Sequence, residues 1–147
     1  MGMYRHNIGL ALLRIFLGVF FLFQGIGKAR WFIDSSILAG QLAQWHQTVP
    51  PGSLSARYLE HVAIPFTNVF ARLVPIGEIS CGLAMVLGLW TDIFAAIAFV
   101  MVMSFHVASG AIFTYGFLTN GYGLPVLGGT LALAFGGVRL PWSLGKS

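Results

Sequence analysis

Charged side chains are scarce in this chain, where they make up only 8% of the 147 residues. Soluble domains carry about 25% charged residues. Hydrophobic residues make up 57% of the chain, and a soluble domain of this size could not hide that much apolar surface. The composition therefore excludes an ordinary soluble domain and predicts an integral membrane protein whose single domain spans residues 1–147.

Cysteine is also scarce, and the single Cys81 excludes an internal disulfide and a CxxC redox motif. None of the histidines forms an HxxxH or HxxH pair, and only His106 falls within a predicted span. We therefore expect no metal site, no haem and no covalently bound cofactor. The net charge of +4 comes from scattered basic residues without a run or patch, which argues against nucleic acid as a partner.

The first hydrophobic stretch covers residues 8–28 and is long enough for a helix to cross the roughly 30 Å bilayer core. It contains residues that lipid should reject, including Arg14 and Lys28. Steps of four and three place Arg14, Gly18, Phe21, Gly25 and Lys28 on one helix face. A face that is charged at both ends and notched by glycine is predicted to lie inside a bundle.

Further apolar stretches complete the prediction of an all-α, four-helix transmembrane bundle. The loop between spans one and two, about residues 29–67, is the most polar part of the chain, and residues 37–48 and 55–62 are predicted to form interfacial helices within it. This loop is either functional or a cap over the bundle mouth. The spans are predicted at about residues 8–28, 68–89, 93–109 and 123–138.

The fourth predicted span contains Gly128, Ala132 and Gly136, a ladder of small residues that favours tight helix contact. Four spans place both termini on one side of the membrane. That side carries Arg5, Arg139 and Lys146, and the long loop carries a similar number of basic residues. Long loops count less in the positive-inside rule, so we expect a multi-pass protein of the inner cell membrane with cytoplasmic termini.

Polar residues from all four predicted spans converge on the half of the bundle beneath the long loop. At 1.5 Å per residue the hairpins bring their side chains to similar depths, and Arg14 reaches toward them from deeper in span one. We expect Glu78 and His106 to act in catalysis as proton carriers. The predicted binding residues are Lys28, Arg72, Arg14, Gln24 and Asn120.

Each of these residues also has a structural interpretation. Gln24 and Asn120, for instance, could form hydrogen bonds between helices rather than bind a ligand. Glu78 is expected to pair with either Arg14 or Lys28, and the pair could simply fix the helix register. His106 is either a proton carrier or a hydrogen-bonded histidine of the bundle. Lys28 and Arg72 either hold an anion or extend toward lipid phosphates.

The order and spacing of several short motifs resemble the DoxX family of small four-helix membrane proteins, including the DoxD-like subunit of thiosulfate:quinone oxidoreductase. Arg14 is followed by Gly25-Ile26-Gly27-Lys28, and Glu78 is followed by Leu87-Gly88-Leu89-Trp90-Thr91. His106, Asn120-Gly121-Tyr122 and Gly137-Val138-Arg139 continue the pattern over nearly the whole chain. The usual terminal S-x-D is replaced by Ser143-Leu144-Gly145.

The resemblance implies a membrane subunit of a quinone-linked, thiosulfate-type redox complex, with a quinone as electron acceptor. The sequence shows no electron carrier of its own, so a second redox subunit is an expected partner beside the lipid bilayer, and an oligomer is compatible with the chain. The alternative function is a non-enzymatic scaffold or assembly factor that binds a partner protein. A third is a small proton-linked transporter, although the chain lacks the repeats of that class.

Overall fold

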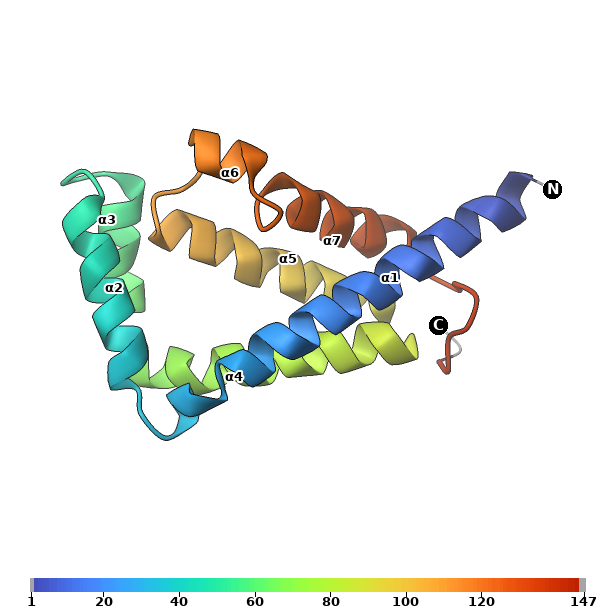
Figure 1. The fold of residues 1–147 in the computed structure, drawn as a ribbon, viewed down its shortest axis with the longest axis horizontal. Helices are drawn as coiled ribbons and strands as arrows, with labels where there is room; N and C mark the ends of the chain where they lie inside the picture. Colours follow the sequence, from blue (N-terminus) through green and yellow to red (C-terminus); the bar gives the residue numbers. More distant parts are fainter. Residues whose placement is uncertain (1, 146–147) are drawn as a thin grey trace.

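All the regular elements that the computed structural model places within residues 2–145 are helices, and side chains are described for residues 7–145. The all-α prediction is therefore confirmed. The bundle consists of the helices α1 (Gly2–Gly27), α4 (Thr67–Leu87), α5 (Thr91–Ala108) and α7 (Leu124–Gly136). Helix α1 packs mainly on α4, and α5 packs mainly on α7 (Figure 1).

The helices of the bundle differ in length. Helices α4, α5 and residues Asn7–Gly27 of α1 are long and apolar enough to cross a membrane. Helix α7 has 13 residues, which gives it a length of about 20 Å, shorter than a bilayer core. The described part of the chain thus has three helices of membrane length, and the predicted fourth span is a shorter apolar helix that ends at Gly136.

The contact between α1 and α4 depends on glycine. A Cβ atom on Gly18 would lie 2.9 Å from the carbonyl oxygen of Gly82, and one on Gly25 would lie 2.9 Å from that of Pro75. Only hydrogen fits at these positions, so the two backbones approach closely. The glycine-notched face predicted for α1 is confirmed, because Arg14 and Phe21 on the same face are buried.

The small-residue ladder predicted on α7 is wrong at two of its three positions. Gly128 and Ala132 are exposed, and a Cβ atom on Gly128 would meet open space. The buried face of α7 instead consists of Val126, Leu127, Thr130 and Leu133. Larger apolar side chains on that neighbouring face bury more surface against α5, and this sets the rotation of the helix.

A short turn joins α4 to α5 and makes them antiparallel neighbours. Gly88 ends α4 in the left-handed conformation, with φ of 71°. The amide of Leu89 donates to the carbonyl of Ala84 at 2.8 Å, and this bond satisfies the end of the helix.

The long connection folds into a helical cap, defined here as residues 29–66, over one end of the bundle (Figure 1). It contains η1 (Ala29–Phe32), α2 (Ser36–Thr48), α3 (Leu54–Tyr58) and the π-helical η2 (Leu59–Ala63). Both helical segments predicted in the loop are present. The cap has its own apolar core with the ends of α4 and α5, formed by Trp31, Leu38, Leu42, Val49, Ala56, Leu59, Ala63, Ala71 and Ala108.

The outer surface of the bundle is strongly apolar. Phe16 and Val100 are 72% and 61% exposed, and Phe135 on α7 is 84% exposed. Large apolar side chains at such exposure need lipid rather than water around them, which agrees with an integral membrane protein in contact with the bilayer.

The ends of the described chain lie away from the cap, where α1 begins and α7 ends (Figure 1). Of the basic residues used to orient the chain, Arg139 is described. The side chains of Arg5 and Lys146 lie outside the described residues, so the orientation stays a prediction.

Candidate functional site

A cavity of about 270 Å³ lies inside the bundle, directly beneath the cap. Residues from α1, η1, α2, α4 and α5 line it, together with a tyrosine that precedes α7. We call this space the polar cavity, because charged and amide groups project into an otherwise aromatic wall. Its lining consists of Phe20, Phe21, Gln24, Lys28, Trp31, Gln41, Trp45, Glu78, Val102, Phe105, His106, Ser109 and Tyr122.

The central feature of the polar cavity is an ion pair between Lys28 and Glu78. The Lys28 Nζ lies 2.7 Å from each carboxylate oxygen of Glu78. The side chains are 19% and 7% exposed, respectively, so both charges are largely withdrawn from solvent. Of the two partners that the sequence left open for Glu78, the structure selects Lys28, and the alternative pair with Arg14 is wrong.

The direction of the two helices explains this pairing. Side chains on a helix tilt toward its N-terminus. Lys28, directly after α1, therefore points back into the bundle, and Glu78 on the antiparallel α4 points toward the cap. The two long side chains converge between the helices, beside the close contact at Gly25.

Aromatic rings and an amide complete the surroundings of the Lys28 ammonium group. The Nζ atom lies 5.9 Å from the ring centroid of Trp31 and 5.5 Å from that of Phe105. It also donates to Gln24 Oε1 at 3.3 Å. A cation over aromatic faces gains electrostatic stabilisation that grows as water is removed.

Tyr122 links the other polar groups of the cavity. Its hydroxyl accepts a hydrogen bond from Gln24 Nε2 at 2.8 Å. Its carbonyl oxygen lies 2.8 Å from His106 Nε2. Because a carbonyl only accepts, this His106 nitrogen carries the proton, and Nδ1 is the acceptor nitrogen of the neutral ring. The Phe117 ring packs edge-on against His106, at 5.0 Å between centroids.

Four of the seven predicted site residues therefore meet in one place: Lys28, Gln24, Glu78 and His106. Tyr122 was not predicted as a site residue, although it belongs to the Asn-Gly-Tyr turn. Trp31 was not predicted as a site residue either, and Trp45 was predicted only as part of an interfacial helix. Their role in the cavity depends on how the cap folds over the bundle, for which no local motif exists.

Arg14 lies outside the polar cavity. Its guanidinium group is fully buried and donates to the Ser143 hydroxyl and, at 3.0 Å, to the carbonyl of Trp142. The Nε atom has no hydrogen-bond partner among the side chains described for residues 7–145. Arg14 therefore holds the C-terminal segment against the bundle, and that segment also pairs with the α4–α5 turn through Leu144 N and Leu87 O at 2.9 Å.

Arg72 and Asn120 also lie away from the cavity lining. The exposed Arg72 donates to the carbonyl of Asn68, one turn earlier in α4, at 2.8 Å. Asn120 accepts a hydrogen bond from the Tyr122 amide at 2.9 Å and so shapes the turn before α7. Asn120 thus acts on the site indirectly, by positioning Tyr122.

The polar cavity offers hydrogen-bond donors, one carboxylate and aromatic faces in a partly closed space. Within residues 7–145, no group of three or more His, Cys, Asp or Glu side chains is placed to hold a metal ion. The donor set suits a planar organic ring with carbonyl oxygens, or a small anion that competes with Glu78 for the ammonium group.

The DoxX family model matches residues 9–114 of this chain. The matched range contains Lys28, Glu78 and His106, and it ends before Tyr122 and the C-terminal segment. The motifs indicated a resemblance to this family over nearly the whole chain, and the family match supports that resemblance over residues 9–114. Comparisons with curated proteins and with solved structures gave no match.

Proposed function

The chain belongs to the DoxX family, and on this premise we propose that it is the membrane subunit of a redox complex that passes electrons from a thiosulfate-type sulfur compound to a membrane quinone. The polar cavity is the proposed site of the quinone ring. The chain would cross the inner cell membrane several times, with its termini in the cytoplasm.

The observation that carries this proposal is the combination of Lys28, Gln24 and Tyr122 with aromatic walls in one cavity beneath the cap. A quinone ring is flat and apolar on its faces, and it accepts hydrogen bonds only at its carbonyl oxygens. Aromatic side chains suit the faces, and the Lys28 ammonium and Gln24 amide suit the oxygens.

Quinone reduction consumes protons as well as electrons, and two cavity residues have suitable chemistry. Glu78 offers a carboxylate that already shares the Lys28 protons at 2.7 Å. His106 offers an imidazole whose Nε2–H is held by the Tyr122 carbonyl, so that Nδ1 is the nitrogen that would exchange a proton. We assign proton transfer to these two residues, each of which would take up a proton from water and pass it to a quinone oxygen as the two electrons arrive, and we assign ring binding to Lys28 and Gln24.

The electrons would come from the oxidation of the sulfur compound on a second redox subunit. We give Arg14, Arg72 and Asn120 no direct part in binding the quinone, because none of them lines the polar cavity. The cap contributes Trp31, Gln41 and Trp45 to the cavity lining, and we place the approach of a donor subunit at the outer surface of the cap.

Sulfur-dependent quinone reduction in native membranes tests the proposal. Thiosulfate is added to membranes from a strain that lacks this protein, and to membranes complemented with wild type, Glu78→Gln, or the double variant Lys28→Met with Glu78→Gln. We expect the deletion to abolish the reaction, and only wild type to restore it at equal protein abundance. Unchanged quinone reduction after deletion would refute the assignment.

The double variant separates chemistry from folding. It removes both charges together, so it avoids the single buried charge that either substitution alone would leave. Retained abundance without activity would support a chemical role for the ion pair. Recovered activity in the double variant would show that Lys28 and Glu78 only hold α1 against α4.

The second candidate function is a non-enzymatic scaffold that binds a partner protein. It is favoured by one observation: Lys28 and Glu78 form a largely buried ion pair next to the glycine contact between α1 and α4. In this case deletion would dissociate a membrane complex, detected by co-purification in mild detergent, and the double variant would still support assembly.

A further inference from the structure

A second hollow of about 320 Å³ lies on the outer side of α4 and α5, beneath the cap. We call it the lateral groove. Its walls are nearly all apolar, and each helix contributes one stripe at helical spacing. The lining consists of Leu38, Leu42 and Trp45 of α2, Tyr58 and Ala63, Phe70, Leu73, Val74 and Gly77 of α4, and Ile97, Val100, Met101, Ser104, Phe105 and Ala108 of α5.

The lateral groove faces the lipid side of the bundle. Leu73 and Val100 on its rim are 56% and 61% exposed. The hydroxyl of Ser104 donates to the carbonyl of Val100 at 2.8 Å within the same helix, so it offers no free hydrogen to a ligand. From Phe70 to Gly77 the groove extends about 10 Å along α4. Such a space suits a hydrocarbon chain that arrives from the bilayer.

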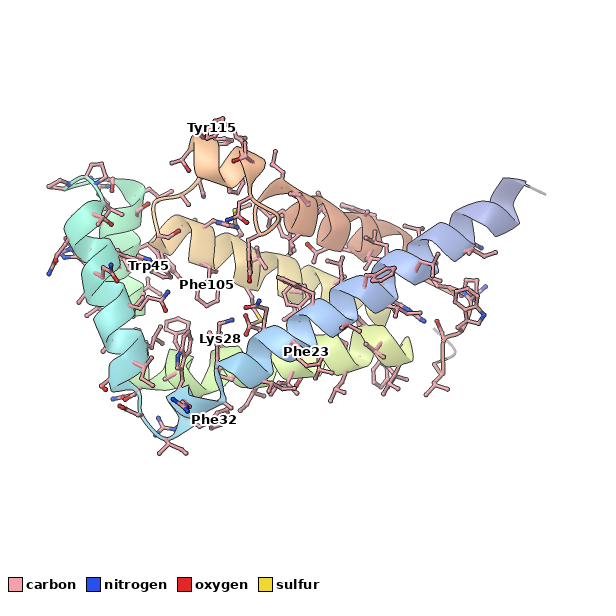
Figure 2. All side chains as sticks on the ribbon, viewed as in Figure 1. Phe23, Lys28, Phe32, Trp45, Phe105 and Tyr115 are labelled. Carbon is pink, nitrogen blue, oxygen red and sulfur yellow. The ribbon has the colours of Figure 1, made fainter. Side chains whose placement is uncertain are left out.

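The lateral groove and the polar cavity share two lining residues, Trp45 and Phe105. Their rings pack edge-to-face, with centroids 6.3 Å apart and an angle of 86° between planes. Figure 2 shows Trp45 of the cap and Phe105 of α5 close together, with Lys28 on the far side of Phe105. We call this pair the aromatic partition, because it alone is common to both spaces.

Helix α5 explains how the two spaces adjoin. Val102, His106 and Ser109 face the polar cavity, and Met101, Ser104 and Ala108 face the lateral groove. Phe105 lies on the ridge between these two faces, 5.5 Å from the Lys28 ammonium group. A rotation of this one side chain would connect an apolar groove that is open to lipid with a charged site inside the bundle.

We propose that the lateral groove holds the first part of the polyprenyl tail of a membrane quinone whose ring occupies the polar cavity, with Phe105 rotated to let the tail pass beneath Trp45. This inference rests on the proposed function, which places the ring in the cavity. The continuity of the groove with the polar cavity favours a tailed quinone, because a flat ring with carbonyl oxygens suits the aromatic walls and donors of the cavity while its tail suits the apolar groove.

Quenching of tryptophan fluorescence measures this binding directly. Trp31 and Trp45 line the polar cavity, and the exposed Trp90 and Trp142 are replaced by phenylalanine to remove background. The protein in lipid nanodiscs is titrated with a polyprenyl benzoquinone and with the same quinone ring without a tail. The variant Ser104→Phe fills the groove, and Ile93→Phe, on the exposed surface of α5 outside the groove, is its matched control.

We expect Ser104→Phe to weaken binding of the tailed quinone about fivefold, because the new ring displaces several packing contacts of the chain. Binding of the tailless ring should change by less than about twofold. Ser104→Leu fills less of the groove and should give a smaller effect in the same direction, and it replaces the phenylalanine variant if that one does not fold. Ile93→Phe should leave both affinities as in wild type.

Several results would overturn the proposal, and they differ from a failure of the proposed function. Equal loss of the tailed and tailless quinones in Ser104→Phe would mean that the groove does not hold the tail. Equal competition by a polyprenyl alcohol, which has the tail but no quinone ring, would mean that the groove takes any long apolar chain. If neither quinone quenched wild type, the proposed function would fail together with this inference, whereas tail-independent binding would refute this inference alone.

Discussion

The Lys28 ammonium group donates to both carboxylate oxygens of Glu78 at 2.7 Å and to Gln24 Oε1 at 3.3 Å. All three oxygens belong to two side chains, so the ammonium group is held from the α1 side and from the α4 side. The ion pair joins the end of α1 to the middle of α4, and it lines the polar cavity. A ligand oxygen that binds Lys28 would compete with Glu78 and Gln24 for the same ammonium group.

The first prediction concerns the stability that the pair contributes. Glu78→Gln and Lys28→Met should each lower the free energy of unfolding by about 3 kcal/mol, because each leaves a largely buried charge without its partner. The double variant should lose clearly less than the sum of the two. Unfolding of detergent-solubilised protein by a denaturing detergent measures all three. An additive double variant would show that the two charges do not interact.

The second prediction concerns the glycines. Gly82→Ala should destabilise the bundle by about 2 kcal/mol or more, because the added Cβ atom would lie 2.7 Å from the Gly18 carbonyl oxygen and force α1 away from α4. Gly128→Ala on α7 is the control. Its Cβ atom meets open space, so it should be neutral or stabilise by up to about 1 kcal/mol. Thermal unfolding of the two variants measures the difference. If Gly82→Ala were as harmless as Gly128→Ala, the close packing of α1 on α4 would be contradicted.

The third prediction concerns Arg14 and the C-terminal segment. Ser143→Ala should cost about 1–2 kcal/mol, because it removes an acceptor from a fully buried guanidinium group. Hydrogen exchange at Leu144, whose amide bonds to Leu87, should become faster. Ser104→Ala is the control, since that hydroxyl bonds within its own helix. Unchanged exchange at Leu144 would show that the Ser143 hydroxyl is not needed to hold the segment, and that the remaining bond from Arg14 to the Trp142 carbonyl is sufficient.

The fourth prediction concerns Tyr122. Tyr122→Phe removes the acceptor of the Gln24 amide but keeps the edge-on ring contact with Phe20 at 5.4 Å. The His106 bond should survive, because it uses the backbone carbonyl. We expect the free energy of unfolding to change by less than about 1 kcal/mol and the affinity for a tailless quinone to fall about threefold, as Gln24 loses its fixed orientation. Quenching of the fluorescence of Trp31 and Trp45 measures that affinity. An unchanged affinity would show that the orientation of Gln24 plays no part in quinone binding.

The fifth prediction concerns the start of α2, outside the membrane-spanning helices. Hydrogen bonds from the side chain and the backbone amide of Ser36 lower the pKa of Asp34. A lowered pKa in the folded state means that the stabilising contribution is present above the ordinary aspartate pKa and is lost as the pH falls through the lowered value. Ser36→Ala should raise the pKa only part of the way, because its amide remains. Carboxyl NMR titration measures the pKa of Asp34 in both proteins. An Asp34 pKa that is the same in wild type and in Ser36→Ala would show that the Ser36 hydroxyl does not lower it.

Much of the fold was predictable because lipid restricts what a chain can do. Long apolar stretches must be helices, and charges inside them must face one another. The pattern of Arg14, Gly25 and Lys28 correctly predicted the buried face of α1. The same reasoning failed on α7, because a ladder of small residues is also compatible with an outward face when larger apolar residues lie one position away.

The candidate site was predicted less completely. Depth along the helices correctly brought Lys28, Glu78 and His106 into one half of the bundle. It could not choose between Arg14 and Lys28 as the partner of Glu78, because that choice depends on where the C-terminal segment returns. Trp45 and Tyr122 were missed because they reach the site from the cap and from a turn, whose positions depend on tertiary contacts rather than on helical periodicity.

The place of Lys28 in the chain has a mechanical consequence. Lys28 directly follows α1 and directly precedes η1, so it lies at one of the two points where the cap joins the bundle, the other being the start of α4. Its ammonium group is locked to Glu78 of α4. A movement of the cap away from the bundle would therefore displace Lys28. A ligand that separated Lys28 from Glu78 would, in turn, weaken the attachment of this end of the cap to α4. Ligand entry and the state of the Lys28–Glu78 ion pair would then be coupled, because both depend on the position of Lys28.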